Sequence, residues 1–276
     1  MQDRASQQGN DQSHAQVLRE ERRDAIAILT LTRPAARNSL SLDMLAALQA
    51  AIDRLSVDRG VSAVVIAATG PAFSAGHDLK ELAAHRADDD RGRAFYRLTM
   101  DRCAAVMTSI LRAPKPFIAA VEGVATAAGC QLVATCDLAV AGAAARFATP
   151  GVNIGLFCST PMVALSRNVP RKRAMEMLLL GEMIDAQSAA DYGLVNRVVA
   201  EGAALDAALE VARTIAAKSP AVVAIGKEAF YAQLELPVTD AYAYASEVMV
   251  RNMMHRDAAE GIGAFIEKRP PDWKGD

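Results

Sequence analysis

Two short stretches rich in small residues could present backbone N–H groups to a ligand. One is Phe73-Ser-Ala-Gly-His-Asp-Leu-Lys80 and the other is Ala127-Ala-Gly-Cys-Gln131. Each should expose unpaired N–H groups where a helix begins. Two such donors aimed at one point would stabilise a carbonyl oxygen that gains negative charge, as in an enolate or a tetrahedral intermediate. Backbone donors need no particular side chain, so helices that merely pack tightly through small residues are the alternative.

The elements around the second stretch are predicted from its hydrophobic pattern. Residues 115–121 form an apolar run that Gly123 ends. Residues 130–136 are apolar on nearly every side, which predicts a buried helix. Residues 137–141 then have the length and composition of a strand. This segment should therefore place its small-residue turn, and the start of its helix, in the centre of the protein.

The rest of the body alternates predicted strands and helices, whereas the last quarter of the chain is purely helical in pattern. The predicted strands of the body are residues 25–31, 61–68, 116–121, 137–141, 145–148 and 194–199. Four predicted helices follow without a strand between them, over residues 203–218, 220–233, 237–254 and 256–268. The predicted organisation is a disordered tail (1–18), a core (19–199) and a helical C-terminal region (200–276).

Composition excludes several classes of protein. The net charge of −2 gives no support to nucleic acid or an anionic membrane surface as a partner. The chain has no apolar stretch of about 18 residues, so we expect no transmembrane helix. Residues 1–16 lack the apolar core of a secretory signal. The four histidines form no H-E-x-x-H motif and no Cys/His cluster, so we expect no metal site.

The cysteines indicate a reducing environment. They are isolated from one another, with no C-x-x-C pair, and all lie among apolar or small residues: Cys103, Cys130, Cys136 and Cys158. Small buried hydrophobic side chains are the interpretation that fits this pattern. Together with the absence of a signal sequence, it predicts a cytoplasmic protein.

The two small-residue stretches, taken with their neighbours, resemble motifs of the crotonase, or enoyl-CoA hydratase/isomerase, superfamily. The sequence Phe73-x-Ala-Gly-x-Asp-Leu-Lys80 is followed by Gly123-x-Ala-x-x-x-Gly-Cys-x-Leu132 and then by Cys136-Asp-Leu138. Further matches occur in the same order along the chain: Arg33-Pro-x-x-x-Asn-Ser-Leu40, Phe147-Ala-Thr-Pro150, Gly181-Glu-Met-Ile-Asp-Ala186, Tyr192-Gly-Leu-Val195 and Ala264-Phe-Ile-Glu-Lys-Arg269. The resemblance covers the chain from about residue 25 to its C-terminus.

The resemblance implies both a fold and a ligand. The fold is the crotonase (ClpP-like) α/β spiral of repeated ββα units, with a helical C-terminal region that builds homo-trimers, often paired into hexamers. The ligand is an acyl-CoA thioester, so coenzyme A enters as part of the substrate and no covalently bound cofactor is expected.

The resemblance also assigns residues by position. The two oxyanion-hole amides correspond to His77 and Ala128. The residues expected along coenzyme A are Arg37, Asp78, Leu79 and Lys80, with Phe265 and Lys268 closing over it from the C-terminal region. The family gives the His77 imidazole no role.

Two departures from the family pattern affect the expected reaction. The glutamates that handle the water and its protons in hydratases correspond to Gln131 and Gly151, and neither residue can ionise. General acid–base catalysis contributes roughly 10²–10⁴-fold per group. We therefore expect inefficient hydration. Isomerisation, hydrolysis or decarboxylation-like chemistry on the thioester enolate would fit better if the protein is catalytic.

Other readings of the site remain open. Cys158, Asn153 and Ser159 lie in the loop after Gly151, and Cys158 could be a nucleophile, although no histidine partner is evident. The loss of both glutamates also fits a non-catalytic acyl-CoA-binding protein. A nucleotide-binding domain is disfavoured because residues 123–129 contain neither G-x-G-x-x-G nor a P-loop.

Overall fold

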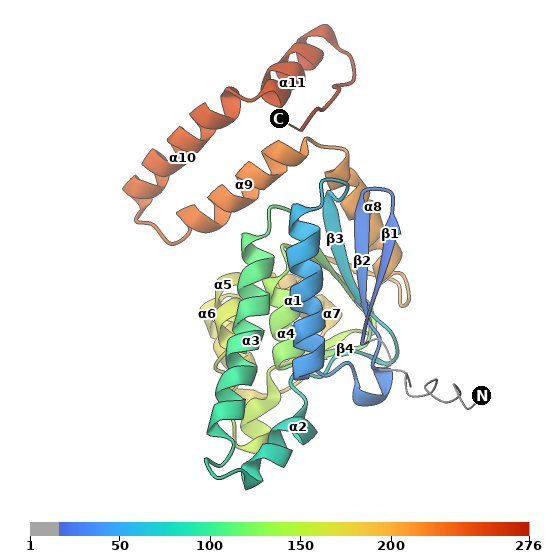
Figure 1. The fold of residues 1–276 in the computed structure, drawn as a ribbon, viewed down its shortest axis with the longest axis vertical. Coiled ribbons are helices and arrows are strands. Elements are labelled where there is room, and N and C mark those ends of the chain that lie inside the picture. The colour runs from blue at the N-terminus through green and yellow to red at the C-terminus, as the bar shows by residue number, and fades with distance from the viewer. Residues whose placement is uncertain (1–16, 276) are drawn as a thin grey trace, which may run out of the picture.

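The structure is a computed structural model that describes residues 17–275. It divides into a body of sheets and helices and an arm of three helices that projects from one end (Figure 1). Most of the tail predicted for residues 1–18 lies outside the described residues. Leu18, at the end of that range, begins the first strand.

The larger sheet of the body has six strands in the order β1-β2-β3-β5-β7-β10. β1 pairs antiparallel with β2, and the remaining neighbours are parallel. The strand bounds are Leu18–Arg23 (β1), Ile26–Leu31 (β2), Ala63–Ala68 (β3), Phe117–Val121 (β5), Leu138–Gly142 (β7) and Arg197–Val199 (β10). β1 was not predicted because its sequence, LREERR, is charged and mostly exposed, as suits an edge strand.

The smaller sheet has four strands in the order β4-β6-β8-β9. Their bounds are Ala72–Ser74, Val124–Thr126, Arg146–Ala148 and Ile184–Asp185. β4, β6 and β8 run parallel, and β9 runs antiparallel to β8. β4, β6 and β9 escaped prediction because each has only two or three residues and lies next to glycine or other small residues typical of turns. They matter because β4 and β6 end just before the two small-residue turns.

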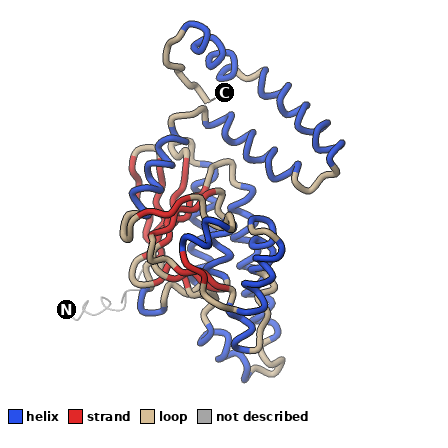
Figure 2. Tube along the Cα trace, turned by 180° about the vertical axis from the view of Figure 1, so that it is seen from behind, coloured by secondary structure: helices blue, strands red, loops and turns tan. Residues whose placement is uncertain are grey.

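Helices pack on both faces of the larger sheet (Figures 1 and 2). α8 (Ala204–Ala216) contacts one face through β3, β5 and β7. The other face supports the main core, which includes α1 (Leu42–Val57), α3 (Arg93–Arg112) and α4 (Ala128–Thr135). Ser41 caps α1, since its hydroxyl accepts from Met44 N–H. The shorter helices of the body are α2 (Leu79–Ala84), α5 (Pro161–Asn168), α6 (Arg171–Leu180) and α7 (Ala186–Asp191), with 3₁₀ turns η1 (Pro34–Ala36), η2 (His85–Ala87) and η3 (Pro150–Ile154).

The arm consists of α9 (Pro220–Gln233), α10 (Val238–Met253) and α11 (Arg256–Glu267). It is fastened to the body by one buried lysine. Lys227 Nζ forms an ion pair with Asp137 at 2.7 Å and donates to the carbonyls of Ile110 and Lys115, both at 2.8 Å. The Tyr231 hydroxyl donates to the second oxygen of Asp137. All three ammonium protons thus find acceptors in the body.

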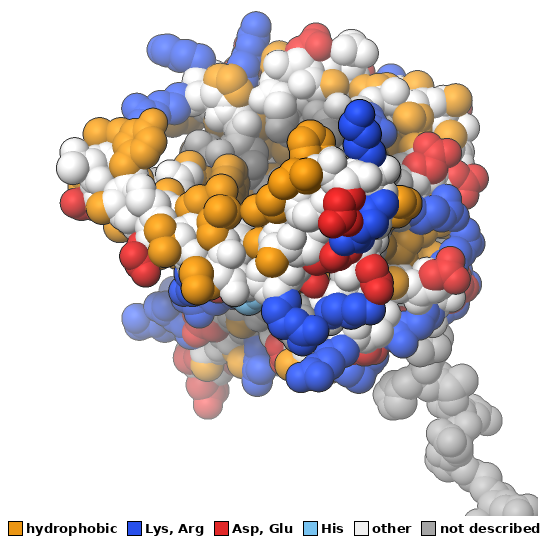
Figure 3. All heavy atoms as spheres, turned by 90° about the horizontal axis from the view of Figure 1, so that it is seen from above, with side chains coloured by type: hydrophobic (Ala, Val, Ile, Leu, Met, Phe, Trp, Pro, Cys, Tyr) orange, Lys and Arg blue, Asp and Glu red, His pale blue; other side chains and the backbone are white. Residues whose placement is uncertain are grey.

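The arm buries little of its own apolar surface. Its exposed large hydrophobic side chains come from all three helices and their connections: Phe230, Leu234, Leu236, Val238, Tyr242, Met249, Val250, Met253, Met254, Ile262, Phe265 and Ile266. Figure 3, which views the molecule from the arm end, shows hydrophobic side chains over this surface. None of the helices within residues 17–275 combines the length and hydrophobicity needed to cross a bilayer.

Candidate functional site

The two small-residue turns meet at the carboxyl edge of the smaller sheet. β4 and β6 are parallel neighbours, so the residues that follow them emerge side by side. A Cβ atom added to Gly76, which has a φ of +89°, would lie 2.8 Å from Ala127 Cβ and 3.0 Å from Ala128 N. A Cβ on Gly129 would lie 2.2 Å from the Ser74 carbonyl oxygen. The backbones approach so closely that both positions require glycine.

The backbone around each turn is held in place by hydrogen bonds. Leu40 N–H donates to Gly76 O at 2.7 Å, and Ala127 N–H donates to Ala148 O at 3.0 Å. Ala127 has a φ of 50°, which turns the chain sharply into α4. The N–H groups of His77 and Ala128 have no acceptor anywhere in residues 17–275. Two unpaired backbone donors therefore lie close together at this edge.

The His77 imidazole is electrically neutral at physiological pH. Burial lowers the pKa of His77 to about 4, because the imidazolium form would lose its hydration. Its Nε2 atom is fully buried and has no hydrogen-bond partner within the described residues. The positive electrostatic potential at the site therefore comes from backbone dipoles and not from a charged histidine.

Asp78 has a structural task at the start of α2. Its carboxylate accepts from the N–H groups of Lys80 and Glu81, and from the Ser39 hydroxyl at 3.0 Å. Burial acts to raise the pKa of Asp78, but these hydrogen bonds outweigh it and the pKa falls below its usual value. Asp78 therefore stays ionised and caps the helix.

The other residues expected along coenzyme A lie beside the same turn. Leu79 and Lys80 occupy the exposed first turn of α2. Arg37 is also exposed, and its carbonyl accepts from Ala75 N–H at 3.0 Å. The structure thus groups Arg37, Leu79 and Lys80 around the turn that carries His77 N–H, with their cationic side chains open to solvent.

Gln131 and Gly151 leave the site without a carboxylate at either expected position. Gln131 lies on α4 with 5% of its surface exposed, and its Oε1 lies 4.0 Å from the Cys103 thiol. Gly151, in η3, has little room for a side chain. A Cβ there would lie 2.9 Å from Leu156 O and 3.0 Å from Cys158 Sγ. Introducing a glutamate at 151 would therefore require residues 156–158 to move.

Three residues in the loop after Gly151 could have replaced the missing glutamates, but each is engaged in another way. Burial raises the pKa of Cys158, more than the Gly151 N–H lowers it, so its thiol stays protonated and is a poor nucleophile. Asn153 Nδ2 donates to Gly181 O at 3.4 Å. The exposed Ser159 hydroxyl donates to Phe157 O, also at 3.4 Å. None of these three residues therefore supplies a base beside the two free N–H groups.

Phe265 and Lys268 do not join the other predicted residues within one chain. Phe265 lies on α11 with 85% of its surface exposed, and Lys268 is the residue that ends this helix. In Figure 1, α11 is at the top of the molecule and α2 at the bottom. Within one chain, these two residues therefore lie at the opposite end of the molecule from α2.

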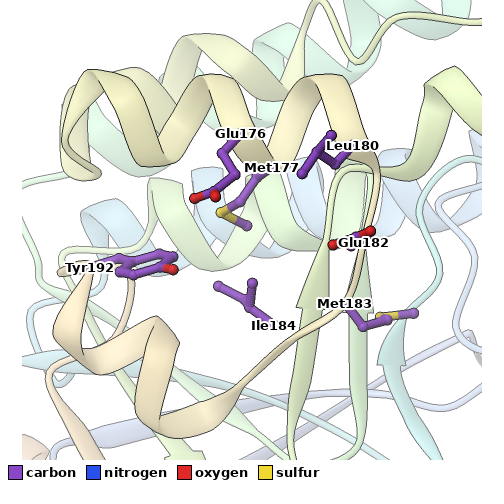
Figure 4. Close-up of a pocket in the computed structure, with 7 residues that line it drawn as sticks. All are labelled: Glu176, Met177, Leu180, Glu182, Met183, Ile184 and Tyr192. Atoms are coloured by element: carbon purple, nitrogen blue, oxygen red, sulfur yellow. The ribbon is translucent and has the colours of Figure 1, made fainter.

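A separate pocket of about 150 Å³ lies between α6 and the β9–α7 segment (Figure 4). Its lining includes Glu176, Glu182 and Tyr192 together with methionine and aliphatic side chains. The Tyr192 ring is covered on one side by the Arg173 guanidinium, 4.9 Å from the ring centre. None of the predicted site residues lines this pocket. Within residues 17–275, no group of three or more His, Cys, Asp or Glu side chains could hold a metal ion.

Comparison with known proteins settles the family. The model of the enoyl-CoA hydratase/isomerase family matches residues 21–276. The chain belongs to this family. It is 48% identical over 250 residues to rat (Rattus norvegicus) enoyl-CoA hydratase domain-containing protein 3, mitochondrial, covering 91% of this chain and 82% of that one. It is 35% identical to 2,3-dehydroadipyl-CoA hydratase of Escherichia coli over 92% of this chain and 97% of that one.

Solved structures confirm the predicted crotonase fold. The crystal structure of human enoyl coenzyme A hydratase domain-containing protein 3 matches with a TM-score of 0.89 and 47% identity, over 93% of this chain and 100% of that chain. An enoyl-CoA hydratase from Mycobacterium smegmatis matches with a TM-score of 0.88 and 53% identity, over 93% and 98% of the two chains.

The predicted cytoplasmic location is wrong by the same comparisons. The similar proteins of rat, mouse and human are all named as mitochondrial. The four free cysteines are buried as expected. A buried thiol shows only that no disulfide formed, and it does not distinguish one compartment that keeps thiols reduced from another.

Proposed function

We propose that this protein binds an acyl-CoA thioester and polarises its carbonyl oxygen between the N–H groups of His77 and Ala128. The observation that carries the proposal is the pair of unpaired backbone donors where β4 and β6 end. Donors fixed by the fold need no reorganisation when charge develops on the oxygen, so they stabilise an enolate or a tetrahedral intermediate. In this proposal Arg37 and Lys80 would meet the phosphates of coenzyme A, and Leu79 its adenine.

Hydration by the two-glutamate mechanism should be slow in this protein. Gln131 can orient a water molecule but cannot remove its proton, and Gly151 offers no functional group. A non-catalytic acyl-CoA-binding protein is therefore the second candidate, and the same two residues are the observation that favours it.

A homo-trimer, or a hexamer of two trimers, would complete the ligand site. The apolar side chains of the arm are exposed in the single chain, and contiguous apolar surface of this kind marks an interface. An arm from a second copy could bring its Phe265 and Lys268 to the coenzyme A end of the site.

The proposal is tested by removing one backbone donor. Ala128→Pro deletes the N–H at the first position of α4, the helix position where proline is ordinarily tolerated, and circular dichroism checks that the variant folds despite the positive φ of Ala127. If an oxyanion is stabilised there, turnover of any reactive acyl-CoA should fall by roughly 10²–10³-fold. Affinity for acyl-CoA should fall more than affinity for free coenzyme A. Arg171→Pro, at the exposed first position of α6, is the matched control outside the site.

Two measurements separate the catalytic and non-catalytic candidates. Turnover of crotonyl-CoA and a panel of acyl-CoA thioesters reports catalysis, and thermal stabilisation by coenzyme A and its thioesters reports binding. Stabilisation without turnover supports the binding protein. Absence of stabilisation by any thioester would contradict both candidates.

A further inference from the structure

Gln131 lies one helical turn after Ala128, on the same face of α4. Residues three apart in an α-helix are neighbours on its surface, and helical side chains lean toward the N-terminus of their helix. The Gln131 carboxamide is therefore directed toward the turn that carries the unpaired Ala128 N–H. All eight residues of α4 are buried, which keeps bulk water away from this face.

The Cys103 thiol determines which end of the carboxamide faces the ligand. Cys103 lies on α3 and is completely buried, and burial raises its pKa to about 12. At neutral pH the group is therefore a thiol with a hydrogen to donate, and Gln131 Oε1 is its acceptor at 4.0 Å. With its oxygen toward Cys103, the carboxamide directs its NH₂ group away from α3.

This NH₂ group is unpaired. Gln131 Nε2 makes no hydrogen bond within residues 17–275. In the same part of the chain, the side-chain polar atoms that are both fully buried and unpaired are Gln49 Oε1, His77 Nε2 and Thr149 Oγ1. Gln131 Nε2 is not one of them, so the chain does not enclose this donor completely.

The site therefore offers donors and no base. Its groups are the N–H of His77, the N–H of Ala128 and the NH₂ of Gln131, and no carboxylate replaces Gly151. A simple acyl thioester needs a positioned base to lose its α-proton. A 3-oxoacyl thioester loses that proton far more readily, because the negative charge spreads over two oxygen atoms. Both oxygens of its enolate would then accept hydrogen bonds from the site.

We propose that the site selects thioesters with a second carbonyl on the β-carbon, and that Gln131 Nε2 is the donor that recognises the β-oxygen. This inference rests on the proposed acyl-CoA binding. On binding as the enolate, the α-C–H bond breaks, its electron pair is shared by the thioester and β-oxygens, and the proton goes to solvent. No covalent bond to the protein forms.

The test compares two thioesters of equal chain length, acetoacetyl-CoA and butyryl-CoA, on the full chain by calorimetry. A hydrogen bond to a charged group is worth about 1.5–3 kcal/mol, so acetoacetyl-CoA should bind the unaltered protein about 10–100-fold more tightly. Its bound form should show the ultraviolet absorption of the enolate. In Gln131→Leu, which is similar in size, the ratio of the two affinities should fall by about 10-fold, leaving only the preference that the N–H groups of His77 and Ala128 supply, and the enolate band should weaken.

Cysteine variants test the role of Cys103 as the residue that orients Gln131. Cys103→Ser retains a hydrogen-bond donor and should keep the preference, whereas Cys103→Ala should reduce it by a factor of about 3. Cys136→Ala removes another buried thiol, beyond the far end of α4, and should leave the preference unchanged.

The outcomes distinguish this inference from the function on which it rests. If neither thioester binds, the proposed acyl-CoA binding fails. If both bind equally to the unaltered protein, or if the preference survives undiminished in a folded Gln131→Leu variant, the recognition of a β-oxygen by Gln131 is overturned and acyl-CoA binding stands.

Discussion

The body and the arm of this protein differ in how much apolar surface they bury. In the body, α4 is buried at every position, and Gln131 and Thr135 are its only side chains with hydrogen-bonding oxygen or nitrogen. In the arm, α9 has one buried residue, and it is Lys227. The one buried residue of α10 is Val248, and those of α11 are Asp257 and Ala264. The body is thus stabilised by its own hydrophobic core, whereas the arm is attached through polar contacts.

The difference indicates how each region contributes to function. A hydrophobic core fixes backbone positions closely, as the free N–H groups of His77 and Ala128 require. The arm keeps many apolar side chains exposed, and exposed apolar surface of this extent is typical of an interaction site. Its polar attachment defines the direction in which it projects while leaving that surface available. The next three predictions test this contrast.

The largest effect is expected from Lys227→Met. This change leaves the Asp137 carboxylate without its cation and the carbonyls of Ile110 and Lys115 without a donor. Removing one partner of a buried ion pair costs about 3–5 kcal/mol. We expect the free energy of unfolding, measured by urea denaturation, to fall by that amount. Hydrogen exchange should rise first in residues 220–275.

The controls separate the loss of the ion pair from the loss of a lysine. Lys218→Met removes an exposed lysine just before α9 and should change stability little. Adding Asp137→Asn to Lys227→Met removes the uncompensated charge and should restore part of the stability. An unchanged arm in the single variant would show that α9 is held by something other than Lys227.

His77, in the body, should make the stability of the protein depend on pH. This effect should be smaller than that of Lys227→Met. The pKa of His77 in the folded protein is about 4, below its ordinary value of 6.5. Between these pH values the unfolded chain binds the proton more readily, so stability rises with pH. The contribution is fully present above pH 6.5, amounts to at most about 3 kcal/mol, and is lost as the pH falls through 4.

Urea denaturation of the unaltered protein and of His77→Gln, at pH 7 and at pH 4.5, checks this expectation. The variant should lose less stability on acidification than the unaltered protein. His255→Gln, a change in the half-buried residue before α11, is the control for removing a histidine elsewhere. If His77→Gln shows the same dependence on pH as the unaltered protein, the imidazole is not buried as described.

The sequence predicted most of the body because its signals are local. The unbroken apolar run that became β3 and the apolar segment of α4 each follow from a few neighbouring residues. The strands that escaped prediction, such as β4 and β6, exist only through pairing with distant segments. Short strands of this kind carry no periodicity that a sequence could show.

The site was predicted as a set of positions but not as a geometry. Resemblance to the family pointed to His77, Ala128, Gln131 and Gly151, and the structure groups the turns that carry the first two. The contact between Cys103 and Gln131 could not be predicted, because it joins two helices through side-chain packing. The contact between Gly151 and Cys158 depends equally on the path of an irregular loop.

A substitution on the exposed apolar face of the arm should change the stability of the single chain least. It should instead weaken assembly, which a similar substitution in the body should not do. Phe265→Glu replaces an aromatic side chain that is 85% exposed in the single chain. If a second copy covers it, burial of this side chain contributes about 1.5–3 kcal/mol to assembly. The apparent Kd for dissociation should then rise about tenfold or more, with little change in the secondary structure of each chain. Sedimentation at several protein concentrations measures the Kd.

Val57→Glu is the matched control, since Val57 is an 80% exposed apolar residue at the end of α1 in the body. It should leave assembly unchanged, because an isolated apolar side chain on a surface needs no partner. A protein that sediments as a monomer at every concentration would show that a second copy does not cover the arm. Weakening by Val57→Glu alone would show instead that the interface lies on the body. In either case the exposed apolar face of the arm would require a different partner.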